Sequence, residues 1–180
     1  MAMRRVDVVA YDSGWPAEFE AAAEELRAAI GDNLLAVHHI GSTAIPGIFA
    51  KPVIDLLPVV ANLSALDGRS AAMASLGYEV MGEFGIAGRR YFRRDDAAGV
   101  RTHHVHAFVD GSGEVERHLA FRDFMRAHPE HAATYGQLKR RLAASFPTDV
   151  EAYMEGKDAL IKDLERRALA WRGGGASATR

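Results

Sequence analysis

The sequence contains no cysteine among its 180 residues. This absence excludes disulfide bonds, thiolate metal ligands and a cysteine nucleophile. Any chemistry must therefore depend on carboxylates, histidine, lysine, arginine, serine or tyrosine. The chain has eight histidines, and they fall in clusters.

The sequence also lacks a long apolar run and an excess of charge of either sign. No window approaches the roughly 18 uncharged apolar residues of a membrane-spanning helix, and the first residues lack the apolar core of a signal peptide. The 22 Lys and Arg residues nearly balance the 24 Asp and Glu residues, which gives a formal net charge of −2. This balance argues against a general nucleic-acid binder or a polybasic membrane protein. We therefore expect a soluble, cytoplasmic protein without a membrane partner.

The hydrophobic content, 48% of the residues, is that of a chain with a substantial core. A chain of this length buries about 70% of its unfolded surface on folding. We expect one domain over residues 1–172. Residues 173–180 are small and polar, which predicts a disordered tail.

Apolar periodicity predicts a chain in which helices flank a mixed sheet. The predicted helices span residues 16–30, 63–76, 114–127, 130–145 and 149–171. The predicted strands span residues 34–40, 51–60, 78–81, 90–94 and 101–109, the last two forming a hairpin. The resulting fold class is α/β or α+β, with four to six strands and a carboxy-terminal helical layer.

One carboxylate, Asp55, interrupts an otherwise apolar strand. Burying an ionised carboxylate costs several kcal/mol unless a cation, a metal or several donors compensate. One interpretation is a structural pairing with arginine or histidine. The other is a ligand site, because a carboxylate near a strand end faces the crevice where α/β folds bind ligands.

Two histidines, His104 and His106, are spaced so that they project from the same face of a strand. His103 and Val105 then point to the opposite face. Such a pair can form a hydrogen-bonded polar face, or it can chelate a metal with Asp55 of a neighbouring strand as third ligand. Two imidazoles and one carboxylate suit zinc or another borderline divalent ion, whereas magnesium prefers oxygen ligands.

Five arginines lie within 13 positions around the predicted hairpin: Arg89, Arg90, Arg93, Arg94 and Arg101. Alternation places Arg89 and Arg93 on one face with Tyr91. The cluster predicts either a solvated edge strand protected by charge or an anion site for phosphate or carboxylate.

A Gly-Ser turn, Gly41 and Ser42, follows the strand over residues 34–40. It is either a simple tight turn or a place where bare backbone amides and a hydroxyl approach an anion.

Two Tyr–Lys pairs, Tyr135 with Lys139 and Tyr153 with Lys157, are each one helical turn apart and share a face. Tyrosine packing beside an extended lysine explains them, and lysines directed towards an anion are the alternative.

Taken in order, several of these segments resemble the GrpB family. The resemblance runs from about residue 9 to residue 169 and rests on residues 39–47, 50–56, 104–106 and 118–123 and on the Tyr–Lys pairs. It implies the nucleotidyltransferase fold, which DNA polymerase β and the aminoglycoside and tRNA nucleotidyltransferases also have. Similar domains are fused to dephospho-CoA kinase in some actinobacteria.

The resemblance also implies a site. In that superfamily a Gly-Ser turn precedes an Asp-x-Asp or Asp-x-Glu pair that holds Mg²⁺, and a later strand adds a third carboxylate. Gly41, Ser42 and Asp55 match this pattern. Leu57 stands where the second carboxylate belongs, and the third position falls in the strand of His104 and His106. Because two-metal phosphoryl transfer needs several oxygen ligands, this departure weakens the expectation of conventional nucleotidyl transfer.

We therefore expect a protein that binds a phosphorylated small molecule or nucleotide, and that either transfers a nucleotidyl or phosphoryl group or acts as a noncatalytic binding or accessory domain. The candidate catalytic residues are Asp55 and Ser42, and the candidate ligands for Mg, Mn or Zn are Asp55, His104 and His106. The expected ligand-binding residues are Gly41, Ser42, Thr43, Lys51, Arg93, Arg101, Arg122, Lys139 and Lys157.

Overall fold

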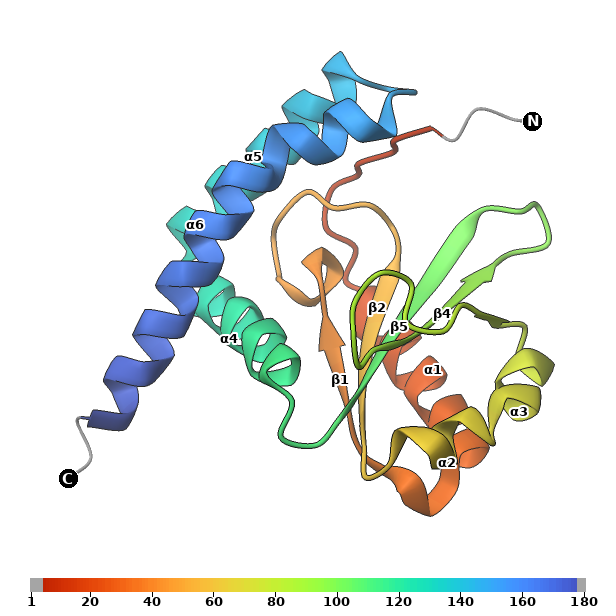
Figure 1. Cartoon of the computed structure of the whole chain (residues 1–180). Helices are drawn as coiled ribbons and strands as arrows, with labels where there is room; N and C mark the ends of the chain where they lie inside the picture. The colour runs from red at the N-terminus through yellow and green to blue at the C-terminus, as the bar shows by residue number, and fades with distance from the viewer. Residues whose placement is uncertain (1–4, 178–180) are drawn as a thin grey trace. The chain divides into compact units, whose positions relative to one another are not determined.

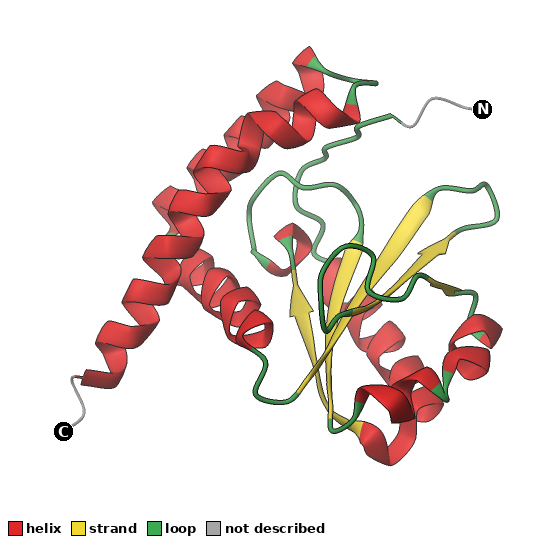
Figure 2. Cartoon of the chain, viewed as in Figure 1, coloured by secondary structure: helices red, strands yellow, loops and turns green. Residues whose placement is uncertain are grey.

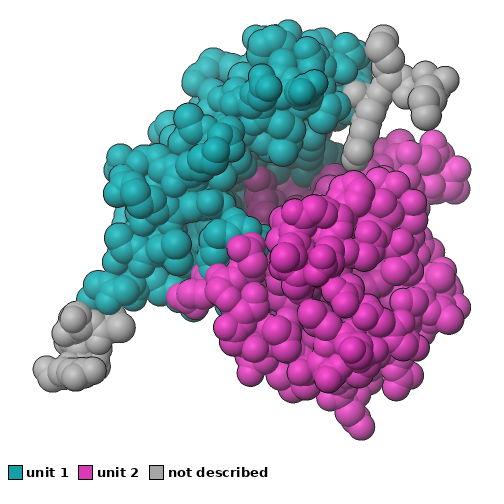
Figure 3. All heavy atoms as spheres, in the orientation of Figure 1, with its two compact units in different colours: residues 1–13, 45–52, 117–180 teal, residues 14–44, 53–116 magenta. Residues whose placement is uncertain are grey.

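The computed structural model describes residues 5–177 and divides the chain into two compact units (Figures 1 and 3). The sheet unit consists of Gly14–Ala44 and Val53–Glu116. The helical unit consists of Met1–Ser13, Ile45–Pro52 and Arg117–Arg180. The expectation of a single domain over residues 1–172 stays a prediction.

The sheet unit contains a five-stranded mixed sheet with the order β1-β2-β5-β4-β3. Strands β2 and β5 are parallel, and the other neighbours are antiparallel. The mixed sheet confirms the predicted fold class. The strands are β1 (Leu34–Ile40), β2 (Ile54–Val60), β3 (Glu79–Val80), β4 (Arg90–Asp95) and β5 (Arg101–Val109).

Helices of the sheet unit pack on one face of this sheet. They are α1 (Trp15–Ile30), α2 (Leu63–Asp67) and α3 (Ser70–Ser75), with short 3-10 turns at Gly31–Asn33 and Ser42–Ala44. Glu25 of α1 pairs with Arg94 at 2.7 Å, and Asp67 of α2 pairs with Arg90 at 2.6 Å. Because side chains alternate along a strand, the neighbours of Arg90 and Arg94 in sequence, including Tyr91 and Arg93, point to the opposite face.

The helix predicted over residues 63–76 is in fact two short helices, α2 and α3, separated by Gly68 and Arg69. Glycine in a helix interior costs about 1 kcal/mol relative to alanine, so the chain breaks there at little expense. The break places Asp67 at the end of α2, where it contacts Arg90.

The helical unit contains α5 (Pro129–Ser145), α6 (Val150–Ser177) and, from Arg117 onwards, α4 (Gly113–Ala127). Helices α5 and α6 run side by side (Figures 1 and 2). The core of the unit consists of Ile45, Ile48, Ala120, Phe124, Met125, Ala132, Tyr135, Leu164 and Ala168.

Helix α6 continues through residues 173–177, where the sequence predicts the start of a disordered tail. Propagation of an existing helix adds one hydrogen bond for each residue that is fixed, so a long helix extends into residues of poor propensity. Residues 178–180 of that predicted tail lie outside the described residues.

Between residues 5 and 177, no helix has both the length and the apolar character that crossing a membrane requires.

Candidate metal centre

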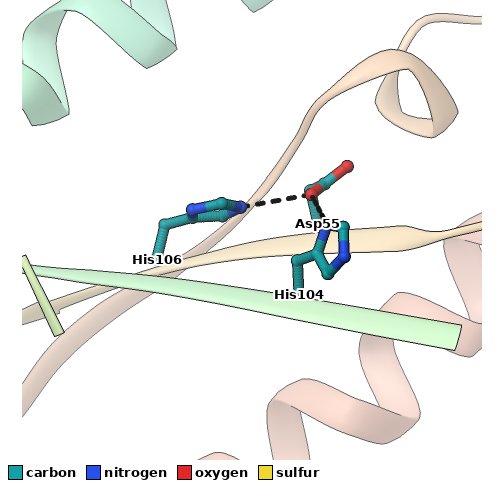
Figure 4. Close-up of side chains that lie close together, drawn as sticks. All are labelled: Asp55, His104 and His106. Carbon is teal, nitrogen blue, oxygen red and sulfur yellow. Dashed lines mark hydrogen bonds and ion pairs between the residues drawn. The ribbon is translucent and has the colours of Figure 1, made fainter. Parts of the chain in front are cut away.

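Asp55, His104 and His106 converge on one face of the sheet (Figure 4). The parallel register of β2 and β5 pairs Asp55 with His104. Asp55 Oδ1 lies 3.2 Å from His104 Nδ1 and 3.2 Å from His106 Nε2. One ligand atom from each residue lies within 4.8 Å of those from the other two. The structure therefore brings together the three side chains that the sequence predicts as metal ligands.

The Asp55 carboxylate is ionised in this environment. Burial raises its pKa, but the hydrogen bonds from His104 and His106 and the electrostatic attraction of their N–H groups lower it well below the ordinary value. An ionised carboxylate only accepts hydrogen bonds, so His104 Nδ1 and His106 Nε2 donate to it. The centre thus consists of a negative carboxylate that accepts hydrogen bonds from two imidazoles. A divalent cation could take the place of these two N–H donors as the partner of the carboxylate.

The second ring nitrogens of the two histidines have different surroundings. His106 Nδ1 lies 3.5 Å from Arg89 Nη1, which donates to it and so places the His106 proton on Nε2. His104 Nε2 is buried and has no hydrogen-bond partner among residues 5–177. A metal bound to His104 Nδ1 would move the histidine proton to Nε2 and leave Asp55 free to act as a ligand.

Gly41 lies directly against the carboxylate. Strand β1 ends opposite Asp55, with Ile40 as its register partner, and Gly41 then turns the chain with φ +72°. A Cβ atom on Gly41 would lie 2.9 Å from Asp55 Cγ. Both the backbone conformation and the close approach therefore require glycine.

Hydrogen bonds of the Thr43 side chain hold the turn after Gly41. Ser42 and Thr43 lie in the 3-10 turn, and the buried Thr43 hydroxyl donates to the Val53 carbonyl at 3.2 Å. The same hydroxyl lies 2.9 Å from His39 Nε2, which donates to it. The Thr43 side chain thus joins the turn to the segment leading into β2. Because the hydroxyl is used in these hydrogen bonds, the backbone amide of Thr43 is its candidate contact with an anion.

Leu57 occupies the next position of β2 on the face of Asp55, and it is completely buried. Strand β2 has the sequence IDLLPVV, so Asp55 is its one carboxylate. The centre offers one carboxylate and two imidazoles, a donor set that suits a single zinc or another borderline divalent ion better than a pair of magnesium ions.

Four of the five arginines near the hairpin pair with acidic residues. Arg90 and Arg94 pair with helix carboxylates on the opposite face, as described above. Arg93 pairs with Glu79 at 2.5 Å, and Arg101 pairs with Asp95. The two predicted anion-binding arginines of the sheet unit therefore each contact a carboxylate, which an incoming phosphate would have to displace.

Arg89 and Tyr91 also border the centre. The sequence places Arg89 in the arginine cluster and Tyr91 on the same face, but neither is among the expected ligand-binding residues. The Arg89 guanidinium lies 4.9 Å from the centre of the Tyr91 ring. The centre of the Tyr91 ring lies 5.4 Å from the centre of the His106 ring and 5.8 Å from that of the His104 ring. Alternation along β4, extended to the residue before it, was the available signal, since it places Arg89 and Tyr91 on the face of Arg93.

The remaining predicted cations belong to the helical unit. Lys51 and Lys157 lie 4.6 and 4.7 Å from the centre of the Tyr153 ring, and Lys139 lies 4.4 Å from that of Tyr135. Both Tyr–Lys pairs share a helix face, as the spacing predicts. Arg122, also in this unit, contacts Asp123 at 2.8 Å.

Comparisons with known sequences give relatives along nearly the whole chain. A family model described as GrpB protein matches residues 5–167. The UPF0157 protein YqkA of Bacillus subtilis is 43% identical over 171 residues, which are 95% of this chain and 49% of that protein. A dephospho-CoA kinase of Mycolicibacterium paratuberculosis is 31% identical over 196 aligned residues, covering 95% of this chain and 48% of the kinase. The chain thus spans about half the length of these two relatives.

Solved structures match as well. The conserved protein GrpB of Enterococcus faecalis superposes with a TM-score of 0.88 at 43% identity, over 92% of this chain and 99% of that chain. The Cid1 poly(U) polymerase with MgGTP bound superposes with a TM-score of 0.53 at 12% identity, over 75% of this chain and 44% of the polymerase. At that identity the second likeness shows the fold alone, which is nucleotidyltransferase-like.

Proposed function

Because the chain belongs to the GrpB family and has a nucleotidyltransferase-like fold, we propose that it binds a phosphorylated small molecule or nucleotide through a divalent metal held by Asp55, His104 and His106. The observation that carries this proposal is the convergence of these three side chains from two strands. The metal would act as a Lewis acid towards a phosphoryl oxygen. Zinc fits two imidazoles better than magnesium does.

The chain's own residues have distinct parts in this proposal. Gly41 leaves room for the Asp55 carboxylate. A metal bound to His106 Nε2 would move the histidine proton to Nδ1, so that Arg89 Nη1 would no longer donate to that atom. The backbone amides of Gly41, Ser42 and Thr43 are the candidate phosphate contacts beside the metal. In the sheet unit Arg93 and Arg101, and in the helical unit Lys51, Arg122, Lys139 and Lys157, are the candidate cations for anionic groups.

A noncatalytic role is the second candidate, and Leu57 favours it. Two-metal phosphoryl transfer uses several oxygen ligands, whereas β2 supplies only Asp55 and continues with a buried leucine. The similarity to about half of a protein named dephospho-CoA kinase supports a domain that accompanies another activity. In the catalytic alternative, Asp55 holds the metal and Ser42 contacts the transferred group.

Thermal unfolding with added metal tests the proposal. We expect Mn²⁺ or Zn²⁺ to stabilise the wild-type chain, by about 2.7 kcal/mol at a concentration of 100 times Kd, and ATP to add to this effect. Asp55→Asn should abolish the metal-dependent stabilisation, because the substitution removes the negative charge while keeping the shape. His103→Gln is the matched control, since His103 lies on the same strand but contacts Arg94 on the opposite face.

The outcomes separate the alternatives. Stabilisation of the wild type by none of Mg²⁺, Mn²⁺ and Zn²⁺, with or without ATP, would contradict the proposal. With water as the acceptor, release of pyrophosphate and AMP (nucleotidyl transfer) or of ADP and phosphate (phosphoryl transfer) from ATP that is lost in Asp55→Asn would select the transferase. Binding of ATP without release of any of these products would select the noncatalytic domain.

A further inference from the structure

A glycine-rich loop over residues 82–88, between β3 and β4, carries an unusual residue next to the candidate metal centre. Gly82, Gly85 and Gly88 have φ between +63° and +84°, the region that glycine favours. Phe84 has φ +47°, and among residues 5–177 it is the non-glycine residue with positive φ. An aromatic residue in this region is strained, and such strain persists only where the surroundings impose it.

The loop is held in this conformation by Arg89, whose side chain is 8% exposed. Arg89 Nη2 donates to the Phe84 carbonyl at 2.7 Å, and Arg89 Nε donates to the Glu83 carbonyl at 3.2 Å. The Glu83 side chain in turn accepts from the Gly88 amide at 2.8 Å. The guanidinium that contacts His106 therefore also fixes the strained residue, so the loop and the centre share one buried cation.

In this loop conformation the aromatic ring of Phe84 is exposed to solvent. The Phe84 side chain is 56% exposed, and its ring stacks on Tyr91 with centroids 5.2 Å apart and planes at 25°. Tyr91 in turn contacts His106. Hydrophobic burial does not explain this arrangement, because most of the Phe84 surface stays exposed and only one face of the ring is covered by Tyr91.

We propose that Phe84 is a stacking platform for a planar ring, such as a nucleobase, of the ligand whose phosphates reach the metal. This inference rests on the proposed function and specifies its ligand class. The rings of His106, Tyr91 and Phe84 lie in sequence, with Tyr91 tilted at 34° to His106 and stacked on Phe84. Every base has a π-face that can extend this stack at Phe84. Because Arg89 already fixes the loop over residues 82–88, binding of a ligand to the Phe84 ring would cost no further conformational entropy of the loop.

A comparison of ATP with tripolyphosphate tests this inference, because only ATP carries a base. Each is titrated into the full chain in saturating Mn²⁺, and Kd is measured by calorimetry. Phe84→Leu should weaken ATP binding by roughly tenfold, the size expected for one stacked base, and leave tripolyphosphate binding unchanged. Phe84→Tyr should retain the wild-type affinity for ATP. Phe146→Leu is the matched control, since it makes the same change at another exposed phenylalanine.

Phe84→Asn is the control for misfolding. Because asparagine tolerates positive φ, this variant should keep or raise the melting temperature, so a loss of ATP affinity in it would not come from unfolding. It should nevertheless lose the same part of the ATP affinity. Equal ATP affinity in the wild type, Phe84→Leu and Phe84→Asn would overturn the stacking platform while leaving the metal site in place. Failure of the wild type to bind either ATP or tripolyphosphate would instead contradict the proposed function and remove the platform with it.

Discussion

Gly41 links the backbone conformation of a turn to the position of the Asp55 carboxylate. Its φ of +72° is a conformation that alanine adopts only at a cost of about 1 to 2 kcal/mol. Its missing side chain also leaves the space in which the carboxylate lies. The turn therefore does more than connect β1 to β2, because it sets how closely Asp55 approaches the chain.

Gly41→Ala should destabilise the fold and also displace Asp55. We expect a loss of at least 1 to 2 kcal/mol in the free energy of unfolding and a loss of roughly tenfold or more in metal affinity. Gly99→Ala is the control: Gly99 has φ +77°, and no atom lies within 4 Å of the position that an added Cβ would take. Urea unfolding and metal titration of both variants check this. Equal metal affinity in the two variants would show that Gly41 does not position Asp55.

Tyr78 gives a prediction about pH. Burial raises the pKa of Tyr78 to about 12, although the nearby Arg94 opposes this shift. Since the pKa in the unfolded chain is about 10, the contribution of Tyr78 is complete below pH 10 and is lost as the pH rises towards 12. At pH 11 the loss should be about 1.4 kcal/mol.

Tyr78→Phe should remove this loss. The Tyr78 hydroxyl is buried without a hydrogen-bond partner in the described part of the chain, so at pH 8 the variant should be as stable as the wild type or up to about 1 kcal/mol more stable. Urea unfolding at pH 8 and pH 11 measures the difference between the two proteins. A difference that does not grow with pH would contradict the assignment.

The candidate metal ligands could be predicted from the sequence because their signal is local. A carboxylate in an apolar strand and two histidines two residues apart are visible without a structure. The partners of the arginines were not visible, since Arg94 and Glu25 are 69 positions apart. Phe84 was missed for a different reason: its loop has no periodicity, and its strain exists only in the folded backbone.

At the scale of elements, α5 packs closely on the segment Ile45–Pro52 within the helical unit. A Cβ atom on Gly136 of α5 would lie 3.1 Å from Ile48 Cβ and 3.1 Å from the Phe49 backbone nitrogen. Backbone atoms cannot move aside as the end of a flexible side chain can. The contact between helix and segment therefore favours glycine at position 136, even though glycine weakens the helix itself.

Gly136→Ala and Gly173→Ala should have opposite effects on stability. At Gly136 the clash should outweigh the gain in helix propensity and cost about 1 to 2 kcal/mol. At Gly173 of α6, nothing lies within 4 Å of the added methyl group, so the change should stabilise by up to about 1 kcal/mol. Thermal unfolding of the two variants measures this. Stabilisation by Gly136→Ala would show that α5 does not approach the segment so closely.

The elements themselves were largely predictable, with errors at the ends and breaks. The hairpin of β4 and β5 follows from two strand patterns with turn residues between them. Strand β2 follows from its nearly continuous apolar run. The division of the predicted helix over residues 63–76 was not predicted, because a single glycine is tolerated in many helices and its effect depends on the contacts of its neighbours. The extension of α6 past residue 172 was missed for a different reason, since propagation from an existing helix overrides local propensity.

At the scale of the whole molecule, a net charge near zero hides a specific arrangement of charges. Acidic residues of α1 and α2 pair with arginines of β4 on one face of the sheet. The opposite face carries a carboxylate with two imidazoles. The family and the fold agree with the resemblance found in the sequence, and the missing second carboxylate at Leu57 distinguishes this centre from a site with several oxygen ligands.

The central claim is that Asp55, His104 and His106 bind one divalent metal ion. Anomalous diffraction from crystals of the full chain soaked in Zn²⁺ tests it most directly. We predict one anomalous peak at about 2.0 to 2.2 Å from an Asp55 oxygen and from one nitrogen of each histidine, and no such peak in Asp55→Asn. An unchanged hydrogen-bonded cluster without a peak in saturating Zn²⁺ would contradict the claim.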